Sequence, residues 1–136
     1  MDIKNLIRVG RVSSVNPANC TARVVFEAQE NNVSYELPVL QLFAKDNKAY
    51  SLPDIDTQVV CIYQPDASGK GLTTGYIVGA CYSTADSPAE NDASVKSMCF
   101  ADGSFIRYDG KGNLEINMTG NVVIKGAKIM LNCEEE

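Results

Sequence analysis

The sequence predicts an all-β protein built in two parts, and three observations lead to this prediction. Several segments of the N-terminal part alternate apolar and polar side chains with the two-residue period of a strand. No long segment repeats its apolar residues with the period of an amphipathic helix. Beyond residue 97, very short apolar segments recur between glycine-containing corners, which is typical of short strands joined by tight turns.

The first predicted strand covers residues 6–15, is rich in Ile and Val, and contains Gly10. The apolar residues change phase across this glycine, from Ile7 and Val9 to Val12. Such a change is typical of a β-bulge, because an extra residue turns the following side chains to the other face of the sheet. We therefore expect a strand that bends at Gly10.

Four more strands are expected before residue 83. Residues 16–19 contain Pro, which fixes its own φ angle, and Asn, which tolerates left-handed geometry, so they predict a turn. This turn would join the first two strands as a hairpin. Residues 39–48 are the only stretch with the character of a short helical turn. The four strands are predicted at residues 20–28, 33–37, 58–63 and 75–82. Five short strands without a long helix favour a small closed or partly closed barrel, for which the oligonucleotide/oligosaccharide-binding (OB) fold is the natural candidate.

Small and acidic residues replace the apolar alternation at residues 84–97, which predicts a linker between a barrel at 1–83 and a C-terminal segment at 98–136. In that segment, after a turn at 109–113, the predicted strands are too short to bury their own apolar face. Identical copies of the chain are the simplest cover, so we expect an intertwined trimeric β-prism or triple β-helix. Its predicted core consists of Leu114, Ile116, Met118, Val122, Ile124, Ile129 and Leu131.

Two alternatives stay open for the C-terminal segment. Alternation alone does not reveal which face points to the trimer axis, so Val123 and Met130 form the opposite candidate set. The short strands would also be explained if they completed one larger sandwich with the N-terminal part of the same chain.

The charge and residue types exclude several function classes. The formal net charge is −5 and the pI is about 4.7, the wrong sign for a protein that binds nucleic acid through phosphates. Histidine is absent, which removes the commonest general base and the commonest metal ligand. No pair of nucleophile and base can be nominated, so we expect a protein that is not an enzyme and holds no metal or cofactor.

Five cysteines occur, at positions 20, 61, 81, 99 and 133, and none belongs to a CxxC pair. This spacing predicts neither a zinc site nor a disulfide framework. Cys20 lies in phase with Ala22 and Val24, as a small apolar residue on a buried strand face would. We expect inert buried thiols in a reducing compartment. The N-terminus has no apolar core of a secretory signal, which predicts synthesis in the cytosol.

Three local motifs have plain interpretations. The run 68–71 lacks the Ser or Thr that follows Lys in a phosphate-binding loop, so we expect a solvated hairpin tip. Asp54 and Asp56, with Asp46 nearby, are too few and too widely spaced for a known calcium loop. The acidic end at 134–136 is either a frayed tail or a handle for a basic tip protein.

In order and spacing, four runs resemble a known family. The run IRVGRVSSVNPANCTARVVF is similar to the opening hairpin of the central spike proteins of contractile phage tails, of the baseplate assembly protein V type, which are related to the valine-glycine-repeat spikes of type VI secretion. YSLPDIDTQVVCIY resembles their next strand. GLTTGYIVGACYS resembles the strand that closes their barrel, here with Gly75, Gly79 and Tyr82. The run from Phe100 to Asn132 resembles the start of their C-terminal spike.

The resemblance implies an N-terminal OB barrel that joins a baseplate hub, followed by a trimeric needle on the tail axis. It implies a structural protein that pierces a target cell envelope. Such a protein is made in the bacterial cytoplasm and assembled into a phage tail, a phage-derived bacteriocin or a related particle. Longer members end in a His-x-His apex that binds iron, and this chain has no histidine, so we expect no iron site and a blunt end. A separate tip protein is then an expected partner.

A second function from a different class remains: a monomeric OB-type binding module for a sugar or peptide. Oligomeric state discriminates the two, since only the spike needs three chains to cover its C-terminal strands. Nucleic acid is not an expected ligand of this barrel, because Trp is absent and the first 94 residues carry more acidic than basic side chains.

Overall fold

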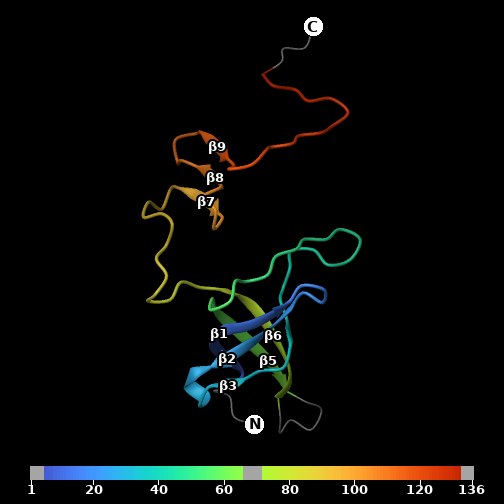
Figure 1. The fold of residues 1–136 in the computed structure, drawn as a ribbon, viewed down its shortest axis with the longest axis vertical. Helices are drawn as coiled ribbons and strands as arrows, with labels where there is room; N and C mark the ends of the chain where they lie inside the picture. The colour runs from blue at the N-terminus through green and yellow to red at the C-terminus, as the bar shows by residue number, and fades with distance from the viewer. Residues whose placement is uncertain (1–4, 66–71, 133–136) are drawn as a thin grey trace. The chain divides into compact units, whose positions relative to one another are not determined.

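The computed structural model describes residues 5–65 and 72–132, and the chain divides into two compact units. Unit 1 comprises Met1–Ser87 and unit 2 comprises Pro88–Glu136. The protein is all-β: antiparallel sheets and a short 3₁₀ helix at Glu27–Gln29 make up the secondary structure of the described residues (Figure 1). No helix in this part of the chain is long and apolar enough to cross a membrane.

Unit 1 contains one sheet with the strand order β3-β2-β1-β5-β6, and β4 also pairs with β2. All of these pairs are antiparallel. After β4 the chain runs beside β6: Val39 forms a parallel bridge with Ile77, and the Leu40 amide donates to the Ile77 carbonyl at 3.1 Å. The strands are β1 (Ile7–Asn16), β2 (Thr21–Phe26), β3 (Asn32–Val33), β4 (Leu37–Pro38), β5 (Gln58–Pro65) and β6 (Leu72–Ala80).

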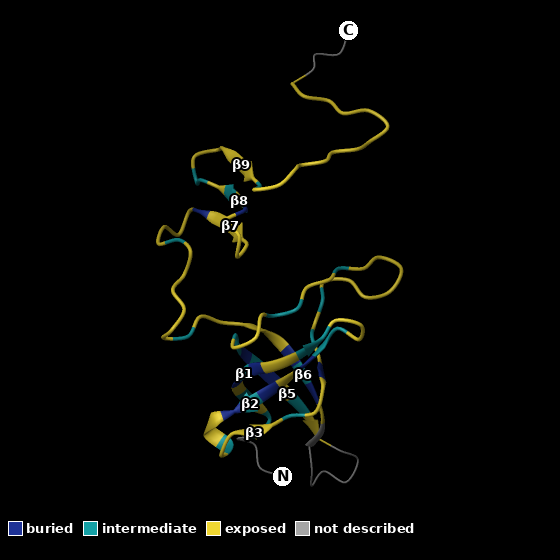
Figure 2. Cartoon of the chain, viewed as in Figure 1, coloured by how far each residue is buried: buried dark blue, intermediate teal, exposed yellow. Residues whose placement is uncertain are grey.

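The core of unit 1 lies on the inner face of this sheet, as the dark blue strands of Figure 2 show. Alternate residues of β2 and β5 fill it because successive side chains of a strand point to opposite faces. β1 adds Val12, and β6 adds Ile77. The buried set is Val12, Ala22, Val24, Phe26, Leu37, Val59, Cys61 and Ile77.

The bulge in β1 is not at Gly10, so that prediction was wrong. The register of β1 against β2 shifts between Val12 and Ser14. Gly10 and Val12 therefore share the inner face, and Ile7 and Val9 lie exposed on the outer one. The glycine is required by space: a Cβ at Gly10 would lie 2.5 Å from both Val24 Cγ1 and the Val25 carbonyl oxygen.

The short helical turn expected at 39–48 was also wrong. Residues 40–51 form an extended excursion whose tip is closed by a bridge between Ala44 and Lys48. The Gln41 side chain joins its two arms, since its Nε2 donates to the Ser51 carbonyl at 2.7 Å and its Oε1 accepts from the Ser51 amide at 2.9 Å. These hydrogen bonds satisfy the backbone without a helix.

Two strand boundaries differ from the expected ones. The third strand is split into β3 and β4, because the Ser34 hydroxyl, rather than a backbone carbonyl, accepts the Val24 amide at 2.9 Å. β6 ends at Ala80, so Tyr82 lies beyond the strand to which it was assigned. The loop tip predicted at 68–71 lies outside the described residues.

Unit 2 contains a three-stranded antiparallel meander of β7 (Lys96–Cys99), β8 (Phe105–Tyr108) and β9 (Leu114–Asn117). β7 begins within the segment expected as a linker. The turn expected at 109–113 joins β8 to β9. There the Asp109 carboxylate accepts hydrogen bonds from the Lys111 and Asn113 amides, while Gly110 and Gly112 take positive φ angles of 81° and 94°.

The strands expected around Val122–Ile124 and Ile129–Cys133 do not form in this single chain. Residues 118–132 are assigned no strand and lie exposed apart from Met118, as the long yellow trace of Figure 2 shows. A β-strand needs a neighbour to accept and donate its backbone hydrogen bonds, and alternation alone cannot supply one. Cys133 lies outside the described residues.

The prediction of buried thiols holds for Cys61 alone among the four cysteines described. Cys61 is fully buried, and burial raises its pKa to about 11. Cys20 is half-buried at a positive φ of 56°, in the turn that precedes β2, and Cys81 and Cys99 are exposed. Cys20 lies before the strand that its phase suggested, which is why alternation misplaced it.

Candidate functional site

The sheet of unit 2 has one apolar face. Directly opposite residues of an antiparallel pair lie on the same side of the sheet, as do residues two apart on one strand. Met98 pairs with Ile106, and Ile106 pairs with Ile116. Tyr108 pairs with Leu114 in the next row, whose third member is Lys96, the one charged residue on this face of the described strands. We call Met98, Ile106, Tyr108, Leu114 and Ile116 the apolar face of unit 2.

The described residues of unit 2 do not bury this face. The exposed fractions of its five side chains run from 36% for Ile106 to 66% for Leu114. Among the described residues of unit 2, only Val95 and Ser104 are buried. A contiguous exposed apolar face of this kind marks a surface that another molecule or segment covers.

The opposite face of the sheet is polar. It carries Ser97, Cys99, Arg107, Glu115 and Asn117, with Phe105 as its large apolar residue. The Arg107 Nε atom lies 2.7 Å from the Glu90 carboxylate, and this hydrogen bond raises the pKa of the guanidinium. The sheet therefore has one polar face and one apolar face, and the apolar face is the one that needs cover.

A hydrogen-bonded corner fixes the place where the chain leaves this sheet. Asp102 accepts the Ser104 amide at 2.9 Å and the Thr119 hydroxyl at 2.9 Å. The Ser104 hydroxyl, which is buried, accepts the Thr119 amide at 3.1 Å. These bonds to the carboxylate hold the pKa of Asp102 below its usual range, with the Ser104 amide as the largest cause.

Beyond Thr119 the chain continues as an extended apolar segment. Six large apolar side chains between residues 122 and 131 are exposed, by fractions from 50% for Ile129 to 81% for Leu131. They include the predicted core residues Val122, Ile124, Ile129 and Leu131 and also the opposite set, Val123 and Met130. In a single chain both sets face solvent.

The structure brings together part of the predicted core. Leu114 and Ile116 share the apolar face of unit 2, and Met118 follows them half-buried. The four residues from Val122 onward are not gathered with them. Sequence reasoning missed Met98, Ile106 and Tyr108, although the alternation of Ile106 and Tyr108 with their neighbours was a signal for two of them.

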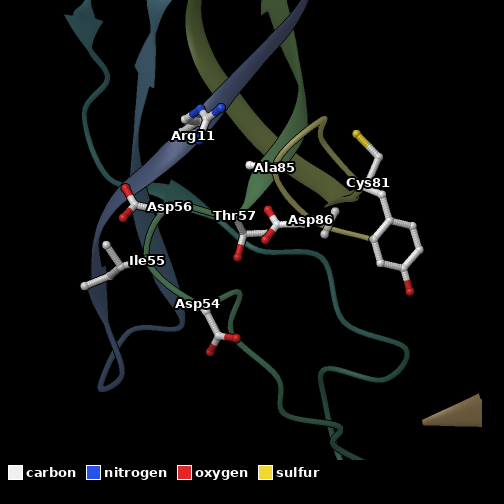
Figure 3. Close-up of a pocket in the computed structure, with 10 residues that line it drawn as sticks. Arg11, Asp54, Ile55, Asp56, Thr57, Cys81, Ala85 and Asp86 are labelled. Carbon is white, nitrogen blue, oxygen red and sulfur yellow. The ribbon is translucent and has the colours of Figure 1, made fainter. Parts of the chain in front are cut away.

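Unit 1 has a separate hollow of about 680 Å³ (Figure 3). It lies between β1, the turn before β5 and the segment after β6, which contribute Arg11, Asp54, Asp56, Tyr82 and Asp86 among others. Asp56 holds a positive φ of 72° and its amide donates to the Val12 carbonyl at 2.8 Å, which fixes the turn. Three carboxylates give the hollow an acidic lining.

The acidic residues considered for calcium do not gather into a metal site in the described part of the chain. No group of three or more His, Cys, Asp or Glu side chains there is placed to hold a metal ion. Arg11, which also lines the hollow, pairs with Glu27 at 3.3 Å. The hollow therefore combines acidic groups with an arginine that is already engaged.

No protein-family model matches the sequence, and no curated protein matches it either.

Proposed function

We propose that this protein is the structural central spike of a contractile injection particle. In this proposal it is a homotrimer that joins a baseplate hub through unit 1 and pierces a target envelope with its C-terminal segment. The observation that carries the proposal is the apolar face of unit 2 together with the exposed apolar segment that follows it. Both need cover that a single chain does not supply.

Three chains supply that cover most simply. Each copy has the same uncovered face and the same extended segment, so a threefold arrangement satisfies all copies at once. Pairing between chains would also let residues 120–130, which alternate in the manner of a strand, form the strand that the single chain lacks. The result is a β-prism or triple β-helix whose core holds Leu114, Ile116, Met118, Val122, Ile124, Ile129 and Leu131.

The mechanism is mechanical. Backbone hydrogen bonds around a common axis must break together under load, and chains wound on one another leave few sheet edges to fray. Stiffness along the axis is the property that such a spike needs when a sheath contracts behind it. No catalytic step is required, and neither a metal nor a cofactor.

Unit 1 is the attachment module in this account. Its five-strand order and the Val39–Ile77 bridge, which brings the segment after β4 to β6, favour an OB-type barrel. The barrel binds the hub protein, and release at that contact frees the spike. A separate tip protein at the C-terminal end is a further proposed partner, and specific nucleic acid is not one.

A second candidate is a monomeric OB-type module for a sugar or peptide. The hollow of about 680 Å³ in unit 1 favours it, since small-ligand sites have this order of size. A peptide with a basic side chain would suit its three carboxylates.

Electron microscopy with an antibody tests the proposal. The antibody is raised against the purified protein and applied to contractile particles from cells that make it. The spike proposal predicts label at the baseplate end of particles. Label that stays with soluble protein, with particles unlabelled, contradicts it and favours the binding module.

A further inference from the structure

A second cavity in unit 1, away from the acidic hollow, is built around an arginine. Arg8 on β1 lies over two aromatic rings: its Cζ atom is 4.1 Å from the centre of the Tyr63 ring and 5.5 Å from that of Phe26. The two rings meet edge to face, with their centres 6.2 Å apart. Its Nε atom donates to the Asn5 carbonyl at 2.9 Å.

This arrangement holds the guanidinium in place. Phe26 is buried in the core, and Tyr63 packs over Gly75 so closely that a Cβ there would lie 2.7 Å from the tyrosine ring. A glycine at position 75 is thus what makes room for the ring that supports Arg8. An ordinary surface arginine has no such support and samples many rotamers.

The terminal amino groups of Arg8 have N–H donors available for a ligand. An arginine has five N–H donors and stays charged at every ordinary pH. Among the residues that the structure describes, none accepts a hydrogen bond from its two terminal amino groups. Arg8 lines a cavity of about 430 Å³, which lies within the size range of small-ligand sites.

The walls of this cavity define the ligand. Val33, Tyr35 and Tyr63 offer apolar and aromatic surface, while Gln29 and Asn32 bring amides. Arg8 is the one basic residue among the described lining residues, and Glu36 adds a negative charge. The paired N–H groups of one guanidinium match one carboxylate in geometry and in charge. A phosphate dianion carries two negative charges, and beside the Glu36 carboxylate one arginine would not neutralise them.

We propose that this cavity is a binding site for a small monocarboxylate with an apolar body. The carboxylate accepts two parallel hydrogen bonds from the terminal amino groups of Arg8, and its apolar part lies against Val33, Tyr35 and Tyr63. This proposal concerns unit 1 alone and is independent of the proposed spike function.

Titration of the full-length protein with phenylacetate, followed by NMR of backbone amides and the Arg8 side chain, tests it. We expect saturable shifts at Arg8, Asn32 and Gly75 with a dissociation constant on the order of 1 mM. Phenylacetamide, which has the same body without the charge, should give none. Saturable binding of phenyl phosphate at equal or higher affinity would overturn the choice of a monocarboxylate.

Variants assign the effect to Arg8. Arg8→Met should abolish phenylacetate binding, and Arg23→Met, on the exposed side of β2, should leave it unchanged. Glu36→Gln should tighten binding by about twofold, because it removes a like charge from the cavity. That variant keeps the test decisive if Arg8→Met fails to fold. Absence of saturable shifts up to about 50 mM, or equal affinity in Glu36→Gln and the natural protein, would overturn the proposal.

Discussion

The Thr119 hydroxyl donates a 2.9 Å hydrogen bond to the Asp102 carboxylate, which ties the end of the β7–β9 sheet to the start of the extended segment. The same carboxylate accepts the Ser104 amide, and the Ser104 hydroxyl accepts the Thr119 amide. Two short polar motifs, Asp102-Gly103-Ser104 and Thr119-Gly120, thus close one corner. The corner determines where the apolar segment begins.

Protonation of Asp102 should loosen this corner. Because the folded-state pKa of Asp102 is lowered, its contribution to stability is present above the unfolded value of about 3.9 and is lost as pH falls through the folded value. We expect hydrogen-exchange protection of the Ser104 and Thr119 amides to drop at acidic pH. Asp102→Asn should show reduced protection at neutral pH and a flatter pH profile, whereas Asp46→Asn in unit 1 should match the natural protein.

A charge on the apolar face of unit 2 should prevent assembly. Ile116→Asp would place three carboxylates in the trimer core, each desolvated and repelled by the others. We expect the variant to elute as a monomer in size exclusion with light scattering. Asn117→Asp introduces the same charge on the polar face of the same strand and should remain trimeric. A trimeric Ile116→Asp protein with unchanged melting would contradict the prism.

The extended segment offers two sets of side chains, and a pair of variants decides between them. Ile124→Asp should reduce the trimer fraction strongly, because Ile124 belongs to the predicted core, and Val123→Asp should reduce it little. Both residues are exposed in the single chain, so the difference reports burial on assembly. The reverse order in sedimentation equilibrium would place Val123 and Met130 at the axis.

Two glycines of unit 1 should respond differently to a methyl group. Gly10→Ala should destabilise unit 1 by about 1 to 3 kcal/mol, because the new Cβ would meet the Val25 carbonyl oxygen, a backbone atom that cannot turn aside. Gly79→Ala has open space around its Cβ and should change stability by less than about 0.5 kcal/mol. Urea denaturation followed by circular dichroism measures both. Similar losses in the two variants would mean that close packing at Gly10 is not the cause.

Cysteine reactivity should follow burial. Burial keeps the pKa of Cys61 at about 11, so its thiol is protonated and shielded at pH 8. We expect iodoacetamide at pH 8 to modify Cys81, which is exposed, while Cys61 reacts only after denaturation. Peptide mass spectrometry identifies the modified sites. Equal rates at the two cysteines in the native protein would show that Cys61 is open to solvent.

Sequence alternation predicted the elements that sit on a half-buried sheet. β2 and β5 were predicted because their inward residues are apolar and the residues between them include polar ones. The turn at 109–113 was predicted because Asp and Gly have defined roles in turns. β1 was found but misread at Gly10. Ile7 and Val9 are apolar on its outer face, so polarity did not distinguish the two faces.

The remaining differences depend on neighbours that a sequence does not name. The split of the third strand depends on one serine hydroxyl, and the shape of residues 40–51 on the Gln41 side chain. For the candidate assembly site, alternation identified Leu114 and Ile116. Met98 joins them only through the register of β7 against β8, which no local pattern encodes. Residues 122–131 alternate as strands do, but the structure assigns them no strand, because alternation does not provide a hydrogen-bonding neighbour.

The molar mass of the native protein tests the central claim most directly. Size exclusion with light scattering is run on the full chain and on a chain that ends at Ser87. The spike account predicts three chains for the full protein and one for the shortened protein, because unit 2 carries the apolar face and the extended segment. A full chain that is monomeric at micromolar concentration would contradict it.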